Sequence, residues 1–223
     1  MTQQSRSAAL IPAAGLGMRL GMGPKCLLRI GESTLLDILV RTLIPLVDEI
    51  LVAAPQGFED KVASILQGRA TLVAGGSSRQ QSIDHMLAAT AADLLLIQDA
   101  ARPFPSRALC AAVLQSAARH GAAGAFLDPA VPVGRLEGDQ VSSYQSRAEA
   151  RIFQAPQAFS RELLISAREK TDGRQFQSTA QMIMDAGNSL LAIPGEPENI
   201  KITTTLDWEI ARKVIAPRLG LDA

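Results

Sequence analysis

Residues 8–19 of the chain read Ala-Ala-Leu-Ile-Pro-Ala-Ala-Gly-Leu-Gly-Met-Arg. The apolar run at 8–11 leads directly into a turn of small residues, a pattern typical of a buried strand that ends in a ligand-binding loop. Small residues allow backbone N–H groups to approach a polyphosphate closely. The spacing matches neither GxGxxG nor GxxxxGKS/T, so the dinucleotide fingerprint and the Walker loop are both absent from it. A tight turn that uses glycine only for its geometry is the alternative interpretation.

Beyond this loop, short apolar runs alternate with helical patterns. Apolar residues in 35–43 recur at the spacing of one helical face, with Ser33 or Thr34 as the N-cap. We predict further strands at 49–54, 70–74, 94–97, 124–127 and 190–193, and further helices at 58–66, 79–91, 106–120, 161–168, 179–186 and 206–215. Apolar strands that alternate with helices indicate a mainly parallel sheet covered on both faces. The expected fold is α/β, a Rossmann-like three-layer sandwich.

Residues 128–151 interrupt this rhythm. They contain two prolines, Gly134, Gly138 and a polar run from Gln140 to Ser146, which together predict an extended arm or hairpin. The chain has no internal repeat and no linker-like tract, and its 223 residues are few for two full domains. We therefore expect one domain over residues 1–223, with the arm as an excursion from it.

Composition excludes several classes of protein. Lys+Arg and Asp+Glu both number 22, so no net charge favours broad binding to nucleic acid or to an anionic membrane. Cys26 and Cys110 are too far apart for a disulfide scaffold or a CxxC metal site, and His85 and His120 cannot form a histidine-rich zinc centre. The apolar stretch at 8–17 is too short and too interrupted to span a bilayer or to act as a signal sequence. We expect a cytoplasmic protein with free thiols.

Two cations flank the first loop. Arg19 ends it, and Lys25 follows in the pair Pro24-Lys25. Either residue alone would be an ordinary solvated side chain, but two cations beside a glycine-rich loop are what a triphosphate and its charged transition state require.

A second loop, residues 74–82, reads Ala-Gly-Gly-Ser-Ser-Arg-Gln-Gln-Ser between a predicted strand and a predicted helix. Backbone donors at the start of that helix, with Ser77, Arg79 and Ser82, are suited to a base, a ribose or a phosphate. A Gly-Gly turn capped by serine is also ordinary loop chemistry, so this loop alone identifies no ligand.

A third segment follows the strand predicted at 94–97 and reads Gln-Asp-Ala-Ala-Arg-Pro-Phe over residues 98–104. Open α/β sheets bind ligands at the carboxyl ends of their strands, where Asp99 lies. Asp99 is therefore a candidate to hold Mg²⁺ against phosphates, and Arg102 a candidate to contact an anion. A structural pair between Asp99 and Arg102, or a capping role for Asp99, is the alternative.

Together the motifs PAAGxGxR, PK, GGxxRxxS and DAARPF resemble those of the 2-C-methyl-D-erythritol 4-phosphate cytidylyltransferase family of the non-mevalonate isoprenoid route. Residues 199–203, Asn-Ile-Lys-Ile-Thr, resemble that family's C-terminal NIKxT motif. The five motifs occur in the family's order over residues 8–215. The resemblance implies a Rossmann-like domain whose protruding β-arm embraces a second subunit, so a homodimer is expected.

The resemblance also implies roles for individual residues. Those that would cradle CTP are Ala13, Ala14, Gly15 and Gly17. Those that would complete the pocket for cytidine and ribose are Gly76, Ser77, Arg79, Ser82 and Ala100. Arg19 and Lys25 would neutralise the α-phosphate with help from Lys201, and Asp99 would stand beside Mg²⁺, with Glu198 as a second candidate for the metal. Arg147 matches the arm arginine that reaches the acceptor phosphate across the dimer.

The implied reaction transfers CMP from CTP to 2-C-methyl-D-erythritol 4-phosphate. An acceptor phosphate oxygen attacks the α-phosphorus in line, and pyrophosphate leaves. The acceptor is already an anion, so no histidine or cysteine base is required; cations, Mg²⁺ and positioning supply the catalysis.

The chain departs from the family on the acceptor side. Where the arm usually carries an Asp-Thr pair, residues 129–134 read Pro-Ala-Val-Pro-Val-Gly, with Pro132-Val133 at the matching place. Ala155 replaces a threonine before Pro-Gln, and Gln177-Ser178-Thr179-Ala180 replaces Thr-Asp-Glu-Ala. Two alternatives therefore stay open: a cytidylyltransferase for another small alditol phosphate or phosphonate, and a non-catalytic CTP-binding paralogue.

Overall fold

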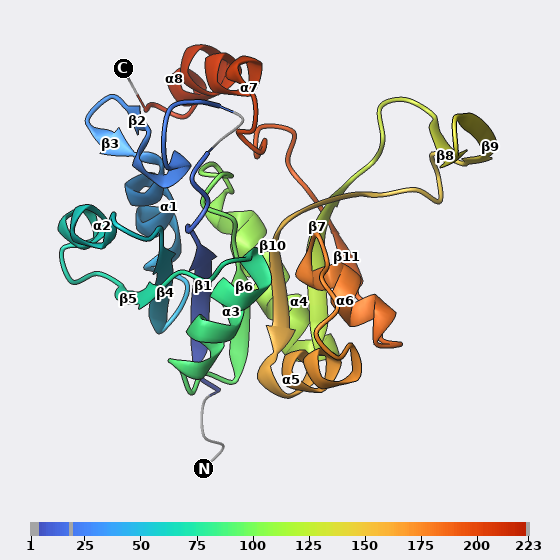
Figure 1. The fold of residues 1–223 in the computed structure, drawn as a ribbon, viewed down its shortest axis with the longest axis horizontal. Coiled ribbons are helices and arrows are strands. Elements are labelled where there is room, and N and C mark those ends of the chain that lie inside the picture. Colours follow the sequence, from blue (N-terminus) through green and yellow to red (C-terminus); the bar gives the residue numbers. More distant parts are fainter. Residues whose placement is uncertain (1–4, 18–19, 222–223) are drawn as a thin grey trace.

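The computed structural model describes residues 5–17 and 20–221. A seven-stranded sheet forms the centre of the molecule, with the strand order β11-β7-β10-β6-β1-β4-β5 (Figure 1). The strands are β1 Ser7–Pro12, β4 Glu49–Ala54, β5 Thr71–Ala74, β6 Leu94–Ile97, β7 Ala122–Leu127, β10 Ile152–Ser160 and β11 Leu191–Pro194. β1 pairs in parallel with β4 and β6, as do β4 with β5 and β7 with β11. The mainly parallel sheet expected from the sequence is thus confirmed.

Helices cover both faces of this sheet. The helices are α1 Leu35–Leu43, α2 Glu59–Leu66, α3 Arg79–Ala88, α4 Arg107–His120, α5 Arg161–Lys170 and α6 Thr179–Asp185. Alternate residues of β1 enter two different clusters: Ala9 and Ile11 pack with α1, α2 and α4, and Ala8 and Leu10 pack with α3, α5 and α6. A strand buried on both faces requires this three-layer arrangement, which the apolar runs predicted.

The C-terminal segment covers the end of the sheet that carries the loops. It begins as α7 (Thr205–Ile210), passes through a π-helical turn (Ala211–Ile215) and ends as α8 (Ala216–Arg218). Trp208, buried in this segment, joins a cluster with Phe104 and Ile202. The cluster extends to a 3-10 turn, η1 (Lys25–Leu27), and the short pair β2 (Arg29–Ile30) and β3 (Ser33–Thr34) through Leu28 and Ile30. Chain segments distant in sequence therefore meet beside the loop that follows β1.

β10 is a strand of the central sheet that the sequence patterns did not predict. It runs antiparallel to β6 and β7, and Gln154, Pro156 and Gln157 interrupt its apolar pattern. Both glutamines are 3% exposed. Gln154 Nε2 donates to the Glu196 carbonyl at 2.9 Å, and Gln157 Oε1 accepts from the Ala180 N–H at 3.0 Å. These bonds satisfy the buried polar groups of both glutamines. Their partners lie far away in the sequence, so no local pattern indicates them.

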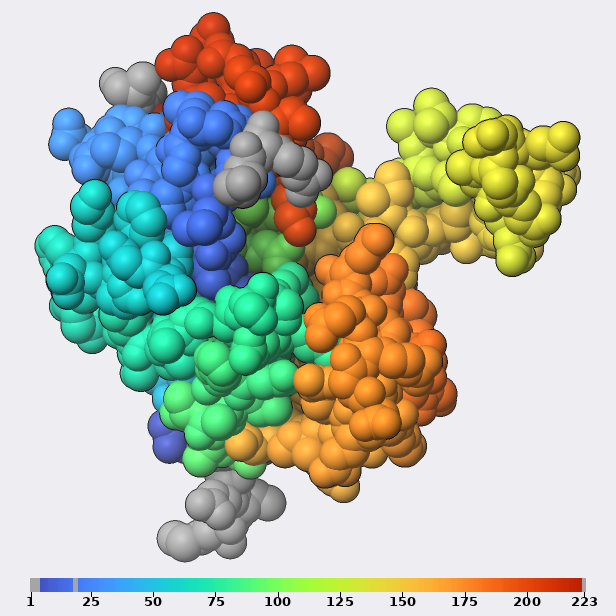
Figure 2. Space-filling model, in the orientation of Figure 1, coloured from blue at the N-terminus to red at the C-terminus, as the bar shows by residue number. Residues whose placement is uncertain are grey.

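The arm leaves the sheet after β7 and returns into β10. Its hairpin, β8 (Val133–Glu137) and β9 (Gln140–Gln145), forms a separate two-stranded sheet. Figures 1 and 2 show it standing away from the rest of the chain. Leu136, Val141 and Tyr144 are 66%, 71% and 83% exposed on it. The protruding arm predicted at 128–151 is therefore present.

Helix boundaries differ from the predictions by a few residues. Of the two predicted cap residues of α1, Thr34 is the one that caps it, by accepting a hydrogen bond from the Asp37 N–H at 3.1 Å. α3 ends at Ala88 instead of residue 91. Within residues 5–17 and 20–221, no helix combines the length and apolar content needed to cross a membrane.

Candidate active site

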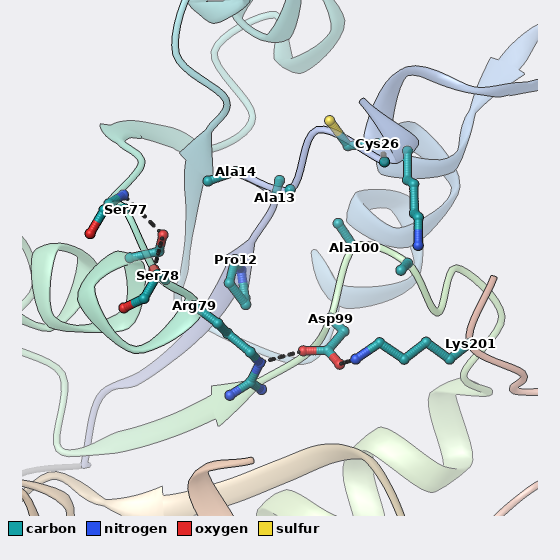
Figure 3. A pocket seen from close by; sticks show the side chains of 16 residues that line it. Pro12, Ala13, Ala14, Cys26, Ser77, Ser78, Arg79, Asp99, Ala100 and Lys201 are labelled. Carbon is teal, nitrogen blue, oxygen red and sulfur yellow. Dashed lines mark hydrogen bonds and ion pairs between the residues drawn. The ribbon is translucent and has the colours of Figure 1, made fainter. Parts of the chain in front are cut away.

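A cavity of about 340 Å³ lies beyond the carboxyl ends of β1 and β6, where three loops meet. Figure 3 shows its lining side chains. The lining residues are Pro12, Ala13, Ala14, Gly15, Gly17, Lys25, Cys26, Gly76, Ser77, Ser78, Arg79, Ser82, Asp99, Ala100, Ala101 and Lys201. The structure thus brings together most of the residues selected from the three motifs and from the NIK segment.

The first loop is held close to the sheet. The Ala13 N–H donates to the Ala53 carbonyl at 3.0 Å, which continues the pairing of β1 with β4 past the strand end. Gly17 has a φ of +67°, and a Cβ there would collide with the Gly23 carbonyl oxygen. Only glycine meets both demands, so this turn can bring Lys25 and its neighbour Cys26 to the cavity wall.

The second loop is organised by its own side chains. Ser78 caps α3, because its Oγ accepts from the Gln81 N–H at 3.1 Å. Ser82, fully buried, accepts from the Gly76 N–H and donates to the Ser78 carbonyl, both at 3.0 Å. Gln81 Oε1 accepts from the Ser77 N–H at 2.7 Å and from the Ser77 hydroxyl at 2.8 Å. Hydrogen bonds within the loop therefore fix its conformation, and α3 starts at the cavity wall.

Asp99 is the electrostatic centre of the cavity. Its Oδ1 accepts from Arg79 Nε at 2.9 Å, and its Oδ2 accepts from Lys201 Nζ at 3.0 Å (Figure 3). Burial by itself would raise the pKa of Asp99, but the charges and hydrogen bonds of Arg79 and Lys201 outweigh it and hold that pKa well below its ordinary value. Asp99 is thus an anion at neutral pH and fixes two cations on the cavity wall.

The described lining residues carry a net positive charge. Lys25, Arg79 and Lys201 contribute three charges and Asp99 removes one, which leaves two. Such a balance in a partly enclosed cavity attracts a polyanion. The cavity therefore suits a nucleoside triphosphate, the class of ligand that the loops also favour.

Several predicted residues lie elsewhere. Arg102 is not among the described residues of the cavity wall; its Nη1 donates to the Asn199 carbonyl at 2.8 Å. Glu198 lines a separate hollow with Arg218 and Phe104, so the structure does not bring it to Asp99. Arg147 lies on the arm, where its Nε donates to the Pro129 carbonyl at 3.0 Å. Arg19 falls outside the described residues.

Arg102 instead ties the NIK segment to the end of β6. Its guanidinium donates to the Asn199 carbonyl, and its own carbonyl accepts a hydrogen bond from Gln98 Nε2 at 2.8 Å. Beside it, the Ile202 N–H donates to the Ala101 carbonyl at 2.8 Å. These bonds flank Lys201 and set its side chain towards Asp99. An arginine near a strand-end aspartate can hold a neighbouring segment in place or bind an anion. The sequence alone did not distinguish these two roles for Arg102.

Four lining residues were not selected from the sequence: Pro12, Cys26, Ser78 and Ala101. Three of them adjoin residues that were selected within the same motifs, and Cys26 follows Lys25, so proximity to a motif was the signal available. Thr179 was noticed only as a departure from a family pattern. The structure gives it a contact, because Arg79 Nη1 donates to its Oγ1 at 3.2 Å.

A mainly parallel α/β sheet with a small-residue loop after its first strand, and a cationic cavity at the strand ends, defines a nucleotidyltransferase-like class of enzyme. Comparison with known proteins narrows this class. A family model described as 2-C-methyl-D-erythritol 4-phosphate cytidylyltransferase matches residues 7–216. The chain belongs to this family, and it is therefore an enzyme of the nucleotidyltransferase class.

Similar proteins and solved structures point to the same family. A protein of that name from Deinococcus radiodurans is 38% identical over 212 residues, covering 94% of this chain and 90% of the relative. One from Thermus thermophilus is 37% identical over 208 residues, covering 92% and 94%. The crystal structure of the Thermus thermophilus enzyme superimposes with a TM-score of 0.80 at 33% identity, covering 94% of this chain and 98% of that chain. The structure of 4-diphosphocytidyl-2C-methyl-D-erythritol synthase from Anaerococcus prevotii gives a TM-score of 0.84 at 25% identity, covering 94% and 95%.

Proposed function

We propose that the protein transfers CMP from CTP to 2-C-methyl-D-erythritol 4-phosphate and releases pyrophosphate, acting as one nucleotidyltransferase domain. The observation that carries this proposal is the cluster of Arg79, Asp99 and Lys201 on a cavity wall shared with Lys25. Fixed cations facing a phosphate stabilise charge as it develops in the transition state.

The nucleotide would enter between the first and second loops. Ala13, Ala14, Gly15 and Gly17 would lie along the triphosphate, and the wall formed by Gly76, Ser77, Ser82 and Ala100 would hold cytidine and ribose. Lys25 and Lys201, with Arg19 from the sequence, would neutralise the α-phosphate as the acceptor oxygen attacks. The acceptor is itself a phosphate anion, so the reaction needs no base from the protein.

The site residues fit a divalent cation in one limited way. Among the described residues, no three His, Cys, Asp or Glu side chains cluster to form a metal cage. Mg²⁺ commonly takes one or two carboxylates together with substrate phosphates, and Asp99 is the carboxylate on this cavity wall. A cation held there would supply further neutralisation of phosphate charge, and Glu198, in its separate hollow, would not contribute to it.

The arm would pair two copies of the chain. Exposed Leu136, Val141 and Tyr144 form an apolar surface on a two-stranded hairpin, and such a hairpin is marginally stable by itself. A second copy would cover this surface, and Arg147 on the arm would reach the acceptor phosphate in the partner's cavity. We propose a cytoplasmic homodimer that uses neither nucleic acid nor membrane as a partner.

The acceptor side favours a second candidate substrate class. Ala155 is buried in β10 where the family carries a threonine, and Thr179 stands where it carries an acid. Loss of hydroxyl and carboxylate partners would weaken recognition of one polyol and admit another. Another small alditol phosphate or phosphonate is therefore the alternative acceptor.

Pyrophosphate release from CTP and Mg²⁺ tests the proposal, with 2-C-methyl-D-erythritol 4-phosphate beside other alditol phosphates and phosphonates. Turnover with methylerythritol phosphate, and its loss in Lys25→Ala, is the expected result. Turnover only with another acceptor would establish the alternative. No turnover while CTP still binds would leave a non-catalytic CTP-binding protein.

A further inference from the structure

Thr179 touches the charge cluster from outside the cavity. It is the first residue of α6, 5% exposed, and its Oγ1 accepts a hydrogen bond from Arg79 Nη1 at 3.2 Å. Arg79 lies 100 residues earlier, at the start of α3. The bond therefore links the loop proposed for the nucleotide to an element on the acceptor side.

We propose that Thr179 is a positioning residue: its hydroxyl fixes the guanidinium of Arg79, so that Asp99 holds Lys201 against the reacting phosphate. This inference rests on the proposed function for its effect on turnover. The contact itself does not depend on which acceptor is used.

The start of α6 is rigid enough to serve this purpose. Ser178 and Gln181 form a reciprocal cap, with the Gln181 N–H donating to Ser178 Oγ at 3.3 Å and the Ser178 N–H donating to Gln181 Oε1 at 3.1 Å. The N–H of Ala180, the residue after Thr179, donates to Oε1 of the buried Gln157 of β10 at 3.0 Å. Thr179 is therefore held between two anchored backbone groups, and its hydroxyl has a defined place.

Two contacts orient a planar guanidinium, whereas one contact leaves it free to rotate. Among the described residues, Asp99 and Thr179 are the acceptors that Arg79 contacts, through Nε and Nη1. Asp99 uses its other oxygen for Lys201. A guanidinium that turns away from Thr179 would shift Asp99, and Asp99 would carry Lys201 with it.

A hydroxyl at this position holds Arg79 without adding a charge. An acid at 179 would give Arg79 a second negative partner and would cancel part of the cavity's positive balance. Threonine accepts the same hydrogen bond without adding charge. Thr179 thus orients Arg79 and leaves its charge for the ligand.

The test compares Thr179→Val, which keeps the shape and removes the hydroxyl, with Thr179→Ser, which keeps the hydroxyl. Thr171→Val is the matched control, since Thr171 is fully buried and its hydroxyl donates to the Ala167 carbonyl at 2.9 Å, away from the cavity. We expect Thr179→Val to lower kcat about tenfold with CTP affinity, measured by calorimetry, changed less than about twofold. Thr179→Ser and Thr171→Val should keep kcat within about twofold of the unchanged protein.

A double-mutant cycle separates positioning from general damage. In an Arg79→Lys background the second contact is already lost, so adding Thr179→Val should change kcat no further. A full additional tenfold loss there, or a Thr179→Ser variant as impaired as Thr179→Val, would overturn the proposal.

An NMR readout keeps this proposal distinct from the proposed reaction. The Arg79 Nη1–H signal, assigned by its disappearance in Arg79→Lys, should be protected from solvent exchange and should lose that protection in Thr179→Val but keep it in Thr179→Ser and Thr171→Val. Unchanged protection would refute the role of Thr179 even if the enzyme turns over methylerythritol phosphate. If Thr179→Val loses this protection but the unchanged protein shows no turnover, the proposed reaction is refuted while the role of Thr179 in orienting Arg79 stands.

Discussion

Asp99 and Lys201 are 102 residues apart in the chain, and Lys201 Nζ donates to Asp99 Oδ2 at 3.0 Å. The contact joins the end of β6 to the segment before α7, and Arg79 completes it from the opposite side of Asp99. Asp99 is 14% exposed, so neither cation is held by a freely solvated carboxylate. The arrangement places charge at the cavity wall before any ligand arrives, which is the preorganisation that phosphoryl transfer requires.

Replacing Asp99 with asparagine should lower kcat by about tenfold or more, because the neutral amide no longer fixes Arg79 and Lys201. It should also raise the Mg²⁺ concentration needed for half-maximal activity. Steady-state kinetics over a Mg²⁺ titration measure both effects.

Asp84→Asn is the control for this change. Asp84 forms an ion pair with Arg168 at 3.0 Å and is not among the described residues of the cavity wall. Its variant should keep the Mg²⁺ dependence of the unchanged protein. An unchanged metal titration in Asp99→Asn would remove Asp99 from the metal's surroundings.

Replacing Lys25 with alanine should lower kcat by about a hundredfold while CTP binding weakens only a few-fold, since the charge acts mainly on the transition state. The sequence predicts the same behaviour for Arg19→Ala. Rapid-quench kinetics and calorimetry separate the two effects. Lys61→Ala, at an exposed position of α2, should change neither. Equal losses in kcat and in CTP affinity would assign Lys25 to simple substrate holding.

The sequence predicted the layers of the fold because strands buried on both faces, such as β1, have continuous apolar runs and α1 shows a helical apolar face. It did not predict β10, whose buried Gln154 and Gln157 find their partners in segments 23 to 45 residues away. Local patterns report burial of apolar groups well, but they do not report the partners of buried polar groups.

The candidate site, too, could be predicted only in part from local sequence patterns. The residues selected from the first two loops, as far as the structure describes them, reach the cavity, since each loop follows a strand whose carboxyl end lies there. Arg102 and Glu198 do not, although they stand within or beside motifs, because the side-chain direction depends on tertiary contacts such as the Asn199 carbonyl. Thr179 contacts the cluster at the start of α6, where the Ala180 N–H is bonded to Gln157 of β10, and no local pattern predicts that placement.

The thiols of Cys26 and Cys110 should react slowly with iodoacetamide at pH 8. Burial raises the pKa of each from 9.0 to about 12, so little thiolate is present. A raised pKa in the folded chain also means that the stability tied to the neutral thiols is complete below about pH 9 and is lost as the pH rises towards 12. Mass spectrometry of labelled protein across this range measures the reactivity.

Cys110 serves as the internal control for Cys26. Cys26 lines the cavity, whereas Cys110 lies within α4, so CTP should slow labelling of Cys26 further and leave Cys110 unchanged. Rapid labelling of Cys26 at pH 8, equal to that of the unfolded chain, would contradict its burial.

Arg147 lies on the arm, where its Nε donates to the Pro129 carbonyl, and it is not among the described residues of the cavity wall. Its proposed role is therefore expected in the cavity of a second subunit. Arg147→Ala and Lys25→Ala should each retain little activity alone. Mixed dimers contain one cavity with Lys25 intact that is served by an intact partner arm. Random mixing makes half of the dimers mixed, each with one complete site of two, so activity should recover to about a quarter of the unchanged protein.

A mixture of Lys25→Ala with Lys201→Ala is the matched control. Both residues line the same subunit's cavity, so no arrangement of these two chains restores a complete site and no activity should return. Mixed dimers are verified by native mass spectrometry with differently tagged chains. Verified Arg147→Ala/Lys25→Ala dimers without recovery would place Arg147 outside the reaction or within its own chain's site, and a purely monomeric protein in sedimentation would contradict the arm's proposed role directly.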